Sequence, residues 1–568
     1  MANPIVQREL MTTLRAPRSA WALAVTVGVL LLLTLALWPA GGLYSLGEQA
    51  SHMLLSAVAL GGLLLVLLIA PAFTATSLTS EKENASYDLL THTLLRPGQI
   101  AWGKIVSSQV FLLLLVISIL PVLAATLFLG GAAAEQLLMV VAVIAGAAAA
   151  TGLLGFAVSA WCHESFTALV VTYSGMLIWC SLPLFCPILL PGLVTQVPFL
   201  GMLAYCSPLS AMLNVLDPGF FAGMKLPVDA EMAWGFGKGG KVLMLGLKKS
   251  TLIYFSSCLA LGGGSWIAGM VSILRPSLTA KNKAGGLSAE EKKVGFPFVL
   301  MDPRRRRRLI GNWSNPILAK ELRSKTFGQG PWIVRGMYAT FALSLLLVGL
   351  MVKQGMGQRM DFDILKLAML AFQLLVVILL VPALLAGAVT QEEEQMQFQL
   401  LRQTLIRPHT FLTGKMLSVW MLVVLLLVAS IPMWWMMAYL ESYQWIGTLV
   451  SLAVVCSTLI LTSSISMAAS SAARTTAAAT AISFAVVCLF AFGTLVPLLM
   501  GGQLPASWRT AILAWNPFAS GLQAVSLDFL KGEPLLWWRF VTRALLGSVI
   551  FFAAAWFFLW RRLRRHLA

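Results

Sequence analysis

The residues of this chain with the chemistry to bind a partner gather in two short charged segments, each set between long apolar runs. In the first charged segment, residues 79–104, two carboxylates flank a lysine at Glu81, Lys82 and Glu83. The second charged segment, residues 390–415, lies 311 positions later and begins with another acidic cluster. The corresponding residues are Glu81, Glu83, Arg96, Pro97, Gly103 and Lys104 in the first and Glu392, Glu394, Arg407, Pro408, Gly414 and Lys415 in the second. Two copies of one charged element predict two equivalent contact sites for another protein.

The composition is that of a membrane protein. The chain has 568 residues, of which 59% are hydrophobic and 11% are charged, whereas a soluble domain carries about 25% charged residues. Uncharged runs long enough to cross a bilayer occur at about 19–47, 53–80, 105–134, 136–162, 165–216, 250–274, 336–352, 367–391, 416–440, 442–473, 475–507 and 544–560. We therefore expect an all-α polytopic membrane protein with about twelve spans.

The net charge of +18 is explained by topology. If both termini are cytoplasmic, most of the 40 lysine and arginine residues lie on that side of the membrane, in agreement with the positive-inside rule. The lipid bilayer is then the chain's surroundings, and no nucleic-acid partner is expected.

An internal repeat organises the chain. Residues 3–10 reappear at 315–322, both beginning Asn-Pro-Ile, and Ser207-Pro208 corresponds to Asn516-Pro517. With the charged segments, these landmarks follow one order at nearly one offset. We predict two six-span halves, residues 1–274 and 332–568, joined by a basic cytoplasmic linker at 275–331. Because six is even, the two halves enter the membrane from the same side and form a parallel repeat.

Each half has an expected surface helix and an expected re-entrant element. Residues 3–19 mix Ile5, Leu10 and Leu14 with arginines and predict a helix along the inner surface. The run at 165–216 is too long for one span. A span followed by a re-entrant hairpin fits it, with Pro191, Pro198 and Pro208 breaking the helix.

The core of the first charged segment is expected to be a helix over residues 81–95, with Tyr87, Leu90 and Leu94 on one face. Phe398, Leu401 and Leu405 occupy the same positions in the second segment. A purely structural role stays open: the acidic residues would oppose the dipole at the helix start, the arginines would serve its end and the prolines would stop it.

The order Ser-Glu-Lys-Glu, Leu-Leu, Leu-Leu-Arg-Pro and Gly-Lys resembles the signature of type-2, exporter-like permeases of ATP-binding-cassette (ABC) transporters. In that family the usual form is Glu-Arg-Glu, Gly-Thr and Glu-x-Leu-Leu, followed by a proline and a Gly-Lys that opens the third span. The resemblance covers nearly the whole chain, twice. Lys82 replaces the usual arginine, Ala85-Ser86 replaces Gly-Thr, and the second copy loses most of the motif at residues 395–399.

The resemblance implies that the charged segments are coupling helices on which a separate ABC ATP-binding subunit docks, in two copies. The twelve residues given above would carry that ATPase coupling, with ATP and Mg²⁺ bound on the partner. It implies a plasma-membrane (inner-membrane) exporter with both halves fused in one chain. A hydrophobic or amphipathic substrate is expected from the wide apolar interface between the halves, because members of the family carry lipids, polysaccharides, drugs and peptides. Charge reversal at Glu81 and Glu83 is then expected to uncouple ATP hydrolysis from transport while leaving the protein folded.

The chain lacks an ATPase motif of its own. Its nearest approach to a phosphate-binding loop, Gly235 to Lys241, is followed by Val242, which cannot hold Mg²⁺. An enzyme is not expected either, because His163-Glu164 lacks the second histidine of a zinc helix. An ion-coupled secondary transporter without an ATPase partner is the alternative, but the spans carry almost no ionisable relay residues.

Overall fold

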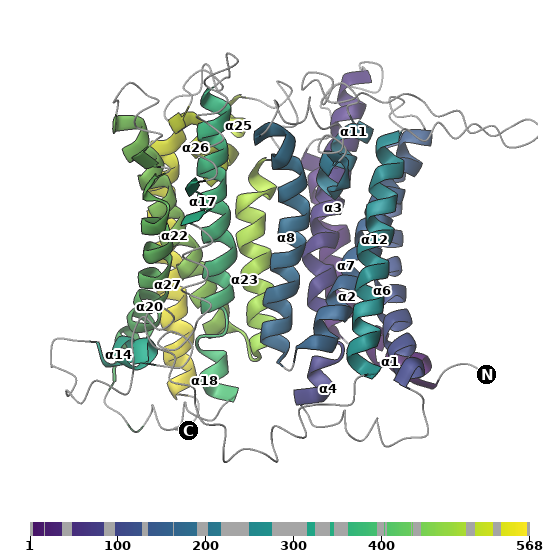
Figure 1. Cartoon of the computed structure of the whole chain (residues 1–568), viewed down its shortest axis with the longest axis horizontal. Helices are drawn as coiled ribbons and strands as arrows, with labels where there is room; N and C mark the ends of the chain where they lie inside the picture. Colours follow the sequence, from purple (N-terminus) through teal and green to yellow (C-terminus); the bar gives the residue numbers. More distant parts are fainter. Residues whose placement is uncertain are drawn as a thin grey trace, which may run out of the picture. The chain divides into compact units, whose positions relative to one another are not determined.

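The computed structural model (Figure 1) describes residues 4–15, 17–36, 48–83, 97–127, 134–162, 164–189, 203–216, 249–274, 315–323, 341–342, 344–345, 362–394, 403, 406–432, 434–435, 445–495, 506–525 and 536–564. The described residues are helical and include no strand, which confirms the all-α prediction. The chain divides into two compact units. Unit 1 comprises Met1–Pro276 with Leu499–Leu504, and unit 2 comprises Ser277–Leu498 with Pro505–Ala568.

Unit 1 contains α1 (Pro4–Arg15), α2 (Pro17–Ala36), α3 (Glu48–Thr74), α4 (Thr79–Glu83), α6 (Pro97–Leu127), α7 (Ala134–Trp161), α8 (Ser165–Leu189), η2 (Ala204–Cys206), α11 (Pro208–Leu216) and α12 (Lys249–Leu274). Unit 2 contains α14 (Pro316–Arg323), α17 (Phe362–Leu385), α18 (Thr390–Glu394), α20 (Pro408–Ala429), α22 (Trp445–Ala472), α23 (Thr476–Ala491), η4 (Gly493–Leu495), α25 (Ala506–Leu513), α26 (Pro517–Val525) and α27 (Leu536–Arg564).

Among the described residues, nine helices are long and apolar enough to cross a membrane. They match nine of the expected runs. Two further runs contain shorter apolar helices, Ala22–Leu35 and Ser165–Cys180. The run at 336–352 lies almost entirely outside the described residues.

One long helix forms the centre of each unit. In unit 1, α7 packs against α12, α3, α6, α11 and α8. Its neighbours approach closely because α7 is rich in glycine and alanine. In unit 2, α22 packs against α27, α17, α23, α26 and α20. It is rich in serine and threonine, whose hydroxyls return hydrogen bonds to carbonyls three or four residues earlier, as Thr458, Thr462 and Ser466 do.

The helix that precedes each charged segment breaks at the same place. Pro71 in α3 and Pro382 in α17 lack a backbone N–H and lie three residues before the helix end. A four-residue turn follows, and then the short helix α4 or α18 begins. In each unit the surface helix, α1 or α14, and the short helix lie at the same end (Figure 1).

A side chain from the central helix closes each break. Ser159 Oγ on α7 accepts hydrogen bonds from the backbone N–H groups of Leu78 at 2.9 Å and Thr79 at 3.1 Å. Ser470 Oγ on α22 accepts from Val389 N at 2.9 Å. Amide groups that the turn would leave unsatisfied are therefore paired.

At the opposite end of each unit, a proline begins a short helix. Pro208 is the first residue of α11 and Pro517 the first of α26, a position where a missing N–H costs nothing. Ser207 Oγ donates to Cys180 O at 2.7 Å, and Asn516 Nδ2 donates to Ala491 O at 2.9 Å. Pro208 therefore starts a helix that is anchored to α8, whereas Pro191 and Pro198 lie outside the described residues.

Gly155 sets the spacing of α3 and α7 beside the break. A Cβ atom on Gly155 would lie 2.1 Å from Thr74 Oγ1 and 3.1 Å from Ala75 N. Since a backbone atom is one of the obstacles, rotation of a side chain cannot relieve the clash.

We predict that Gly155→Ala destabilises the chain by about 1–3 kcal/mol through overpacking, measured as a lower thermal unfolding midpoint in detergent. The control is Gly263→Ala on α12, because a Cβ there meets nothing within 4 Å. Equal midpoints for the two variants would show that α3 and α7 are not in tight contact.

Candidate functional site

A buried lysine lies at the centre of the first charged segment. Lys104, on the second turn of α6, is 4% exposed. Its Nζ lies 2.7 Å from Glu81 Oε1 on α4 and 3.2 Å from Glu9 Oε1 on α1, and it donates to Ser77 O at 3.0 Å. Arg8 Nη2 lies 3.7 Å from the same Glu81 oxygen. We call Glu9, Glu81 and Lys104 the unit 1 cluster.

Unit 2 contains the same arrangement. Lys415 Nζ on α20 lies 2.6 Å from Glu321 Oε1 on α14 and 2.9 Å from Glu392 Oε1 on α18. Lys320 Nζ lies 2.8 Å from Glu392 Oε1, in the place that Arg8 takes in unit 1. We call Glu321, Glu392 and Lys415 the unit 2 cluster. Each cluster joins three helices that are distant in sequence.

In each cluster, ion pairs with the buried lysine hold three helices together. A buried ammonium group is tolerated only when carboxylates and hydrogen-bond acceptors surround it. Lys104 and Lys415 each have two carboxylates within 3.2 Å. Removing one partner leaves the others buried and uncompensated, so each cluster holds its surface helix, its short helix and its long span together.

The glutamate that ends each short helix caps a neighbouring span. Glu83 accepts hydrogen bonds from Ser165 N at 2.6 Å and Ser165 Oγ at 2.7 Å, at the start of α8. Glu394 accepts from Thr476 N at 2.9 Å and Thr476 Oγ1 at 3.0 Å, at the start of α23. A carboxylate at a helix N-terminus satisfies free amides and opposes the helix dipole.

The structural role left open for these carboxylates is seen in part, because they bind lysines and amide groups of other helices. A role at the start of a helix over residues 81–95 stays a prediction, because residues 84–95 lie outside the described residues. The expectation that charge reversal leaves the fold intact changes with these contacts. Glu81→Lys would place a third cation beside Lys104 and Arg8, and Glu83→Lys would put a cation at the positive end of α8.

The remaining predicted residues lie around the clusters. Pro97 and Pro408 are the first residues of α6 and α20, so they begin the following spans. Their role in stopping the coupling helices stays a prediction. Arg407 is the extended residue before α20. Gly103 is buried one residue before Lys104. Arg96 and most of both predicted coupling helices, residues 84–96, 395–402 and 404–405, lie outside the described residues.

Gly414 has a packing role beside Lys415. A Cβ atom there would lie 2.7 Å from Ile317 Cβ and 2.8 Å from Asn315 Oδ1. The glycine therefore lets α14 approach α20 closely enough for Glu321 to reach Lys415.

Sequence reasoning did not assign the partners Glu9, Glu321, Ser165 and Thr476. A signal for them exists, because Ser165 and Thr476 are 311 positions apart, as are Ser159 and Ser470. Positions that share the repeat offset and carry similar hydroxyl or carboxylate groups would have identified them.

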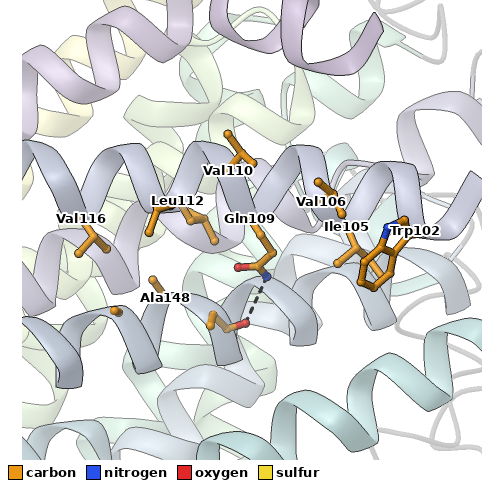
Figure 2. Close-up of a pocket in the computed structure, with 11 residues that line it drawn as sticks. Trp102, Ile105, Val106, Gln109, Val110, Leu112, Val116 and Ala148 are labelled. Atoms are coloured by element: carbon orange, nitrogen blue, oxygen red, sulfur yellow. Dashed lines mark hydrogen bonds between the residues drawn. The ribbon is translucent and has the colours of Figure 1, made fainter. Parts of the chain in front are cut away.

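An apolar groove of about 360 Å³ runs between α6 and α7 in unit 1 (Figure 2). Trp102, 54% exposed, lies at one end and Val116 toward the other. Gln109 Nε2 donates to Ala149 O at 3.3 Å across the groove, and this bond leaves an almost wholly apolar lining.

Residues 4–221 match the family model described as ABC-2 type transporter. No curated protein matches the chain. The matched region includes the whole unit 1 cluster, Glu83 with its partner Ser165, and the groove.

We predict that Lys104→Met and Lys415→Met each destabilise the folded chain by about 3–5 kcal/mol, because two carboxylates lose their cation. Thermal unfolding in detergent measures the loss. The double variant Lys104→Met/Glu81→Leu should recover part of it, since only one carboxylate then stays unpaired.

The control for these variants is Glu164→Gln, which changes an exposed carboxylate near the same end of unit 1. If Lys104→Met and Glu164→Gln have the same unfolding midpoint, the cluster does not hold the helices together.

Proposed function

We propose, from the match of residues 4–221 to the family model described as ABC-2 type transporter, that the chain is the permease subunit of an ATP-driven exporter. ATP and Mg²⁺ bind on separate ABC ATPase subunits, two per chain, which dock on the charged segments. The two units are the two permease halves of this subunit. The protein spans the inner (plasma) membrane with both termini in the cytoplasm.

The observation that carries this proposal is an ion pair in each charged segment. The pair joins the short helix before the predicted coupling helix to the span after it. Residues 84–96 connect α4 to α6, and the Glu81–Lys104 pair joins the same two helices at 2.7 Å. Glu392 and Lys415 do the same for α18 and α20 at 2.9 Å. A force applied to either segment therefore enters helices that are already tied together.

The contacts give that force a path. From the first segment it reaches α1 through Glu9, α6 through Lys104 and α8 through Glu83. From the second it reaches α14 through Glu321, α20 through Lys415 and α23 through Glu394. When the ATPase subunits close on ATP, each unit then moves as one body and alternates the access of the pore.

Six of the twelve coupling residues transmit force inside a unit in this mechanism: Glu81, Glu83 and Lys104, and their unit 2 counterparts Glu392, Glu394 and Lys415. Docking falls to the segments themselves, with Tyr87, Leu90 and Leu94 as the contact face of the first and Phe398, Leu401 and Leu405 as that of the second.

The substrate we propose is hydrophobic or amphipathic, and its outward direction follows the family. Support for its chemistry comes from the groove between α6 and α7, whose lining is almost entirely apolar. Such a groove favours an acyl chain or another apolar group over a sugar or an ion.

An ion-coupled transporter is less well supported. In the part of the chain that the structure describes, α7, α8, α22 and α23 carry no Asp, Glu, Lys, Arg or His between their first and last turns. Carriers driven by an ion gradient place such groups inside the spans. The charges here concentrate where a partner ATPase would act.

The test is co-purification of the tagged chain in mild detergent, with mass spectrometry of bound proteins. We expect an ABC ATPase at two copies per chain. Leu90→Glu and Leu401→Glu should lower its recovery by about tenfold or more, since a buried charge at an interface costs several kcal/mol, while the unfolding midpoint stays unchanged. Met11→Glu, at an exposed position of α1, is the control.

Recovery of no ATPase, even after cross-linking in cells, would contradict the proposal. Uptake driven by an ion gradient would then become the assay of choice.

A further inference from the structure

The carbonyl groups at the end of the central helix accept hydrogen bonds from a different cation in each unit. The last carbonyls of a helix have no partner within it, and a cation there is favourable. In unit 1, Lys82 Nζ on α4 donates to Ser159 O at 3.2 Å, Ala160 O at 2.6 Å and Cys162 O at 2.9 Å, at the end of α7. The cation belongs to the charged segment itself.

Unit 2 has the opposite charge at the equivalent position. The 311-residue offset places Glu393 where Lys82 stands, and a carboxylate cannot donate to carbonyls. Arg562 of α27 supplies the donor in unit 2. Its Nη2 donates to Ala473 O, the carbonyl equivalent to that of Cys162, and its Nη1 donates to Glu393 Oε2 at 2.5 Å.

We propose that Arg562 is the positioning residue of the second charged segment. It supplies the charge that Lys82 supplies in unit 1, and it ties α18 to the last membrane helix, α27. The inference rests on the proposed coupling function and adds a second route for the force in unit 2.

Burial supports a defined ion pair. The side chain of Arg562 is 15% exposed and that of Glu393 is 40% exposed, so the pair is partly shielded from solvent. Arg562 is also held on two sides, by a carboxylate of α18 and a carbonyl of α22. A planar guanidinium makes both contacts at once, which an ammonium group cannot do in the same geometry.

The consequence is that the two segments are not mechanically equivalent. In unit 1 the last helix, α12, reaches the end of α7 through Ser272 Oγ, which donates to Ala160 O at 3.0 Å. In unit 2 the last helix bonds directly to the charged segment. Displacement of α18 therefore moves α27 with it, and loss of Arg562 uncouples the second segment while leaving the first intact.

A charge-exchange cycle tests this assignment. Arg562→Ala removes the cation from Glu393 and Ala473 O. Glu393→Lys places two cations beside the same carbonyl. In the double variant Glu393→Lys/Arg562→Ala, the lysine recreates the unit 1 arrangement. We expect each single change to lower the unfolding midpoint by about 2–4 °C and the double variant to recover more than half of that loss.

The matched control is Arg561→Ala, which removes an exposed arginine one position earlier on α27. Its midpoint should equal that of the unmodified chain. Additive losses in the double variant, or equal effects of Arg561→Ala and Arg562→Ala, would overturn the assignment.

Two further measurements separate a positioning role from simple stability. Hydrogen exchange of the peptide covering 390–394 should rise in Arg562→Ala, whereas exchange of the 79–83 peptide should not. In the complex with its ATPase, Arg562→Ala should keep ATP hydrolysis but lose transport, and the double variant should restore it. If the double variant restores stability and hydrogen exchange but not transport, Arg562 has no coupling role. If no ATPase binds the chain, the proposed function is wrong, but the assignment of the Glu393–Arg562 ion pair is unaffected.

Discussion

The structure depends on the requirement that a charge buried among apolar helices be neutralised where it stands. Lys104 is 4% exposed and has carboxylates from α1 and α4 at 3.2 and 2.7 Å. An ammonium group in that place is too costly without them. The three helices are consequently fixed with respect to one another, and Lys415 fixes α14, α18 and α20 in the same way. A chain made mostly of apolar surface thus gains its specific geometry at one end of each unit from a few ion pairs.

Helix ends impose the next constraint. The start of α8 and of α23 is capped by a glutamate from the charged segment, and the ends of α7 and α22 are capped by a cation. The glutamate caps at the helix starts are the same in both units, whereas the cations at the helix ends differ. Since the carbonyls need a donor whichever side chain provides it, the change from Lys82 to Glu393 is compatible with the fold only because Arg562 is present. Both units thus have a cation at the carbonyl end of the central helix, Lys82 in unit 1 and Arg562 in unit 2.

Much of this was predictable from sequence, and the limits have physical reasons. Of the twelve spans predicted from long uncharged runs, nine are matched by described helices of spanning length, because apolar length largely decides whether a helix crosses a bilayer. The repeat offset drew attention to Glu81, Lys104, Glu392 and Lys415. It did not reveal that they bond to each other, since pairing depends on how α4 folds back beside α6. The Glu393–Arg562 pair joins residues 169 positions apart, and only the packing of α27 against α22 brings them together. Pro97 and Pro408 were predicted as helix stops, and the structure adds that each is the first residue of the next helix, where a missing N–H is tolerated.

We expect unit 1 to move as one body because the buried lysine, Lys104, holds its helices together. The direct test is the spin-label distance between positions 11 and 138 in a chain freed of its seven cysteines, in complex with its ATPase. Both positions are exposed, and the part of α7 from position 138 to its last residue is about 35 Å long at 1.5 Å per residue. We expect one narrow distribution of this distance, the same without nucleotide and with ATP trapped. In Lys104→Met the distribution should broaden. A distance that shifts on ATP binding in the unmodified unit would contradict this expectation.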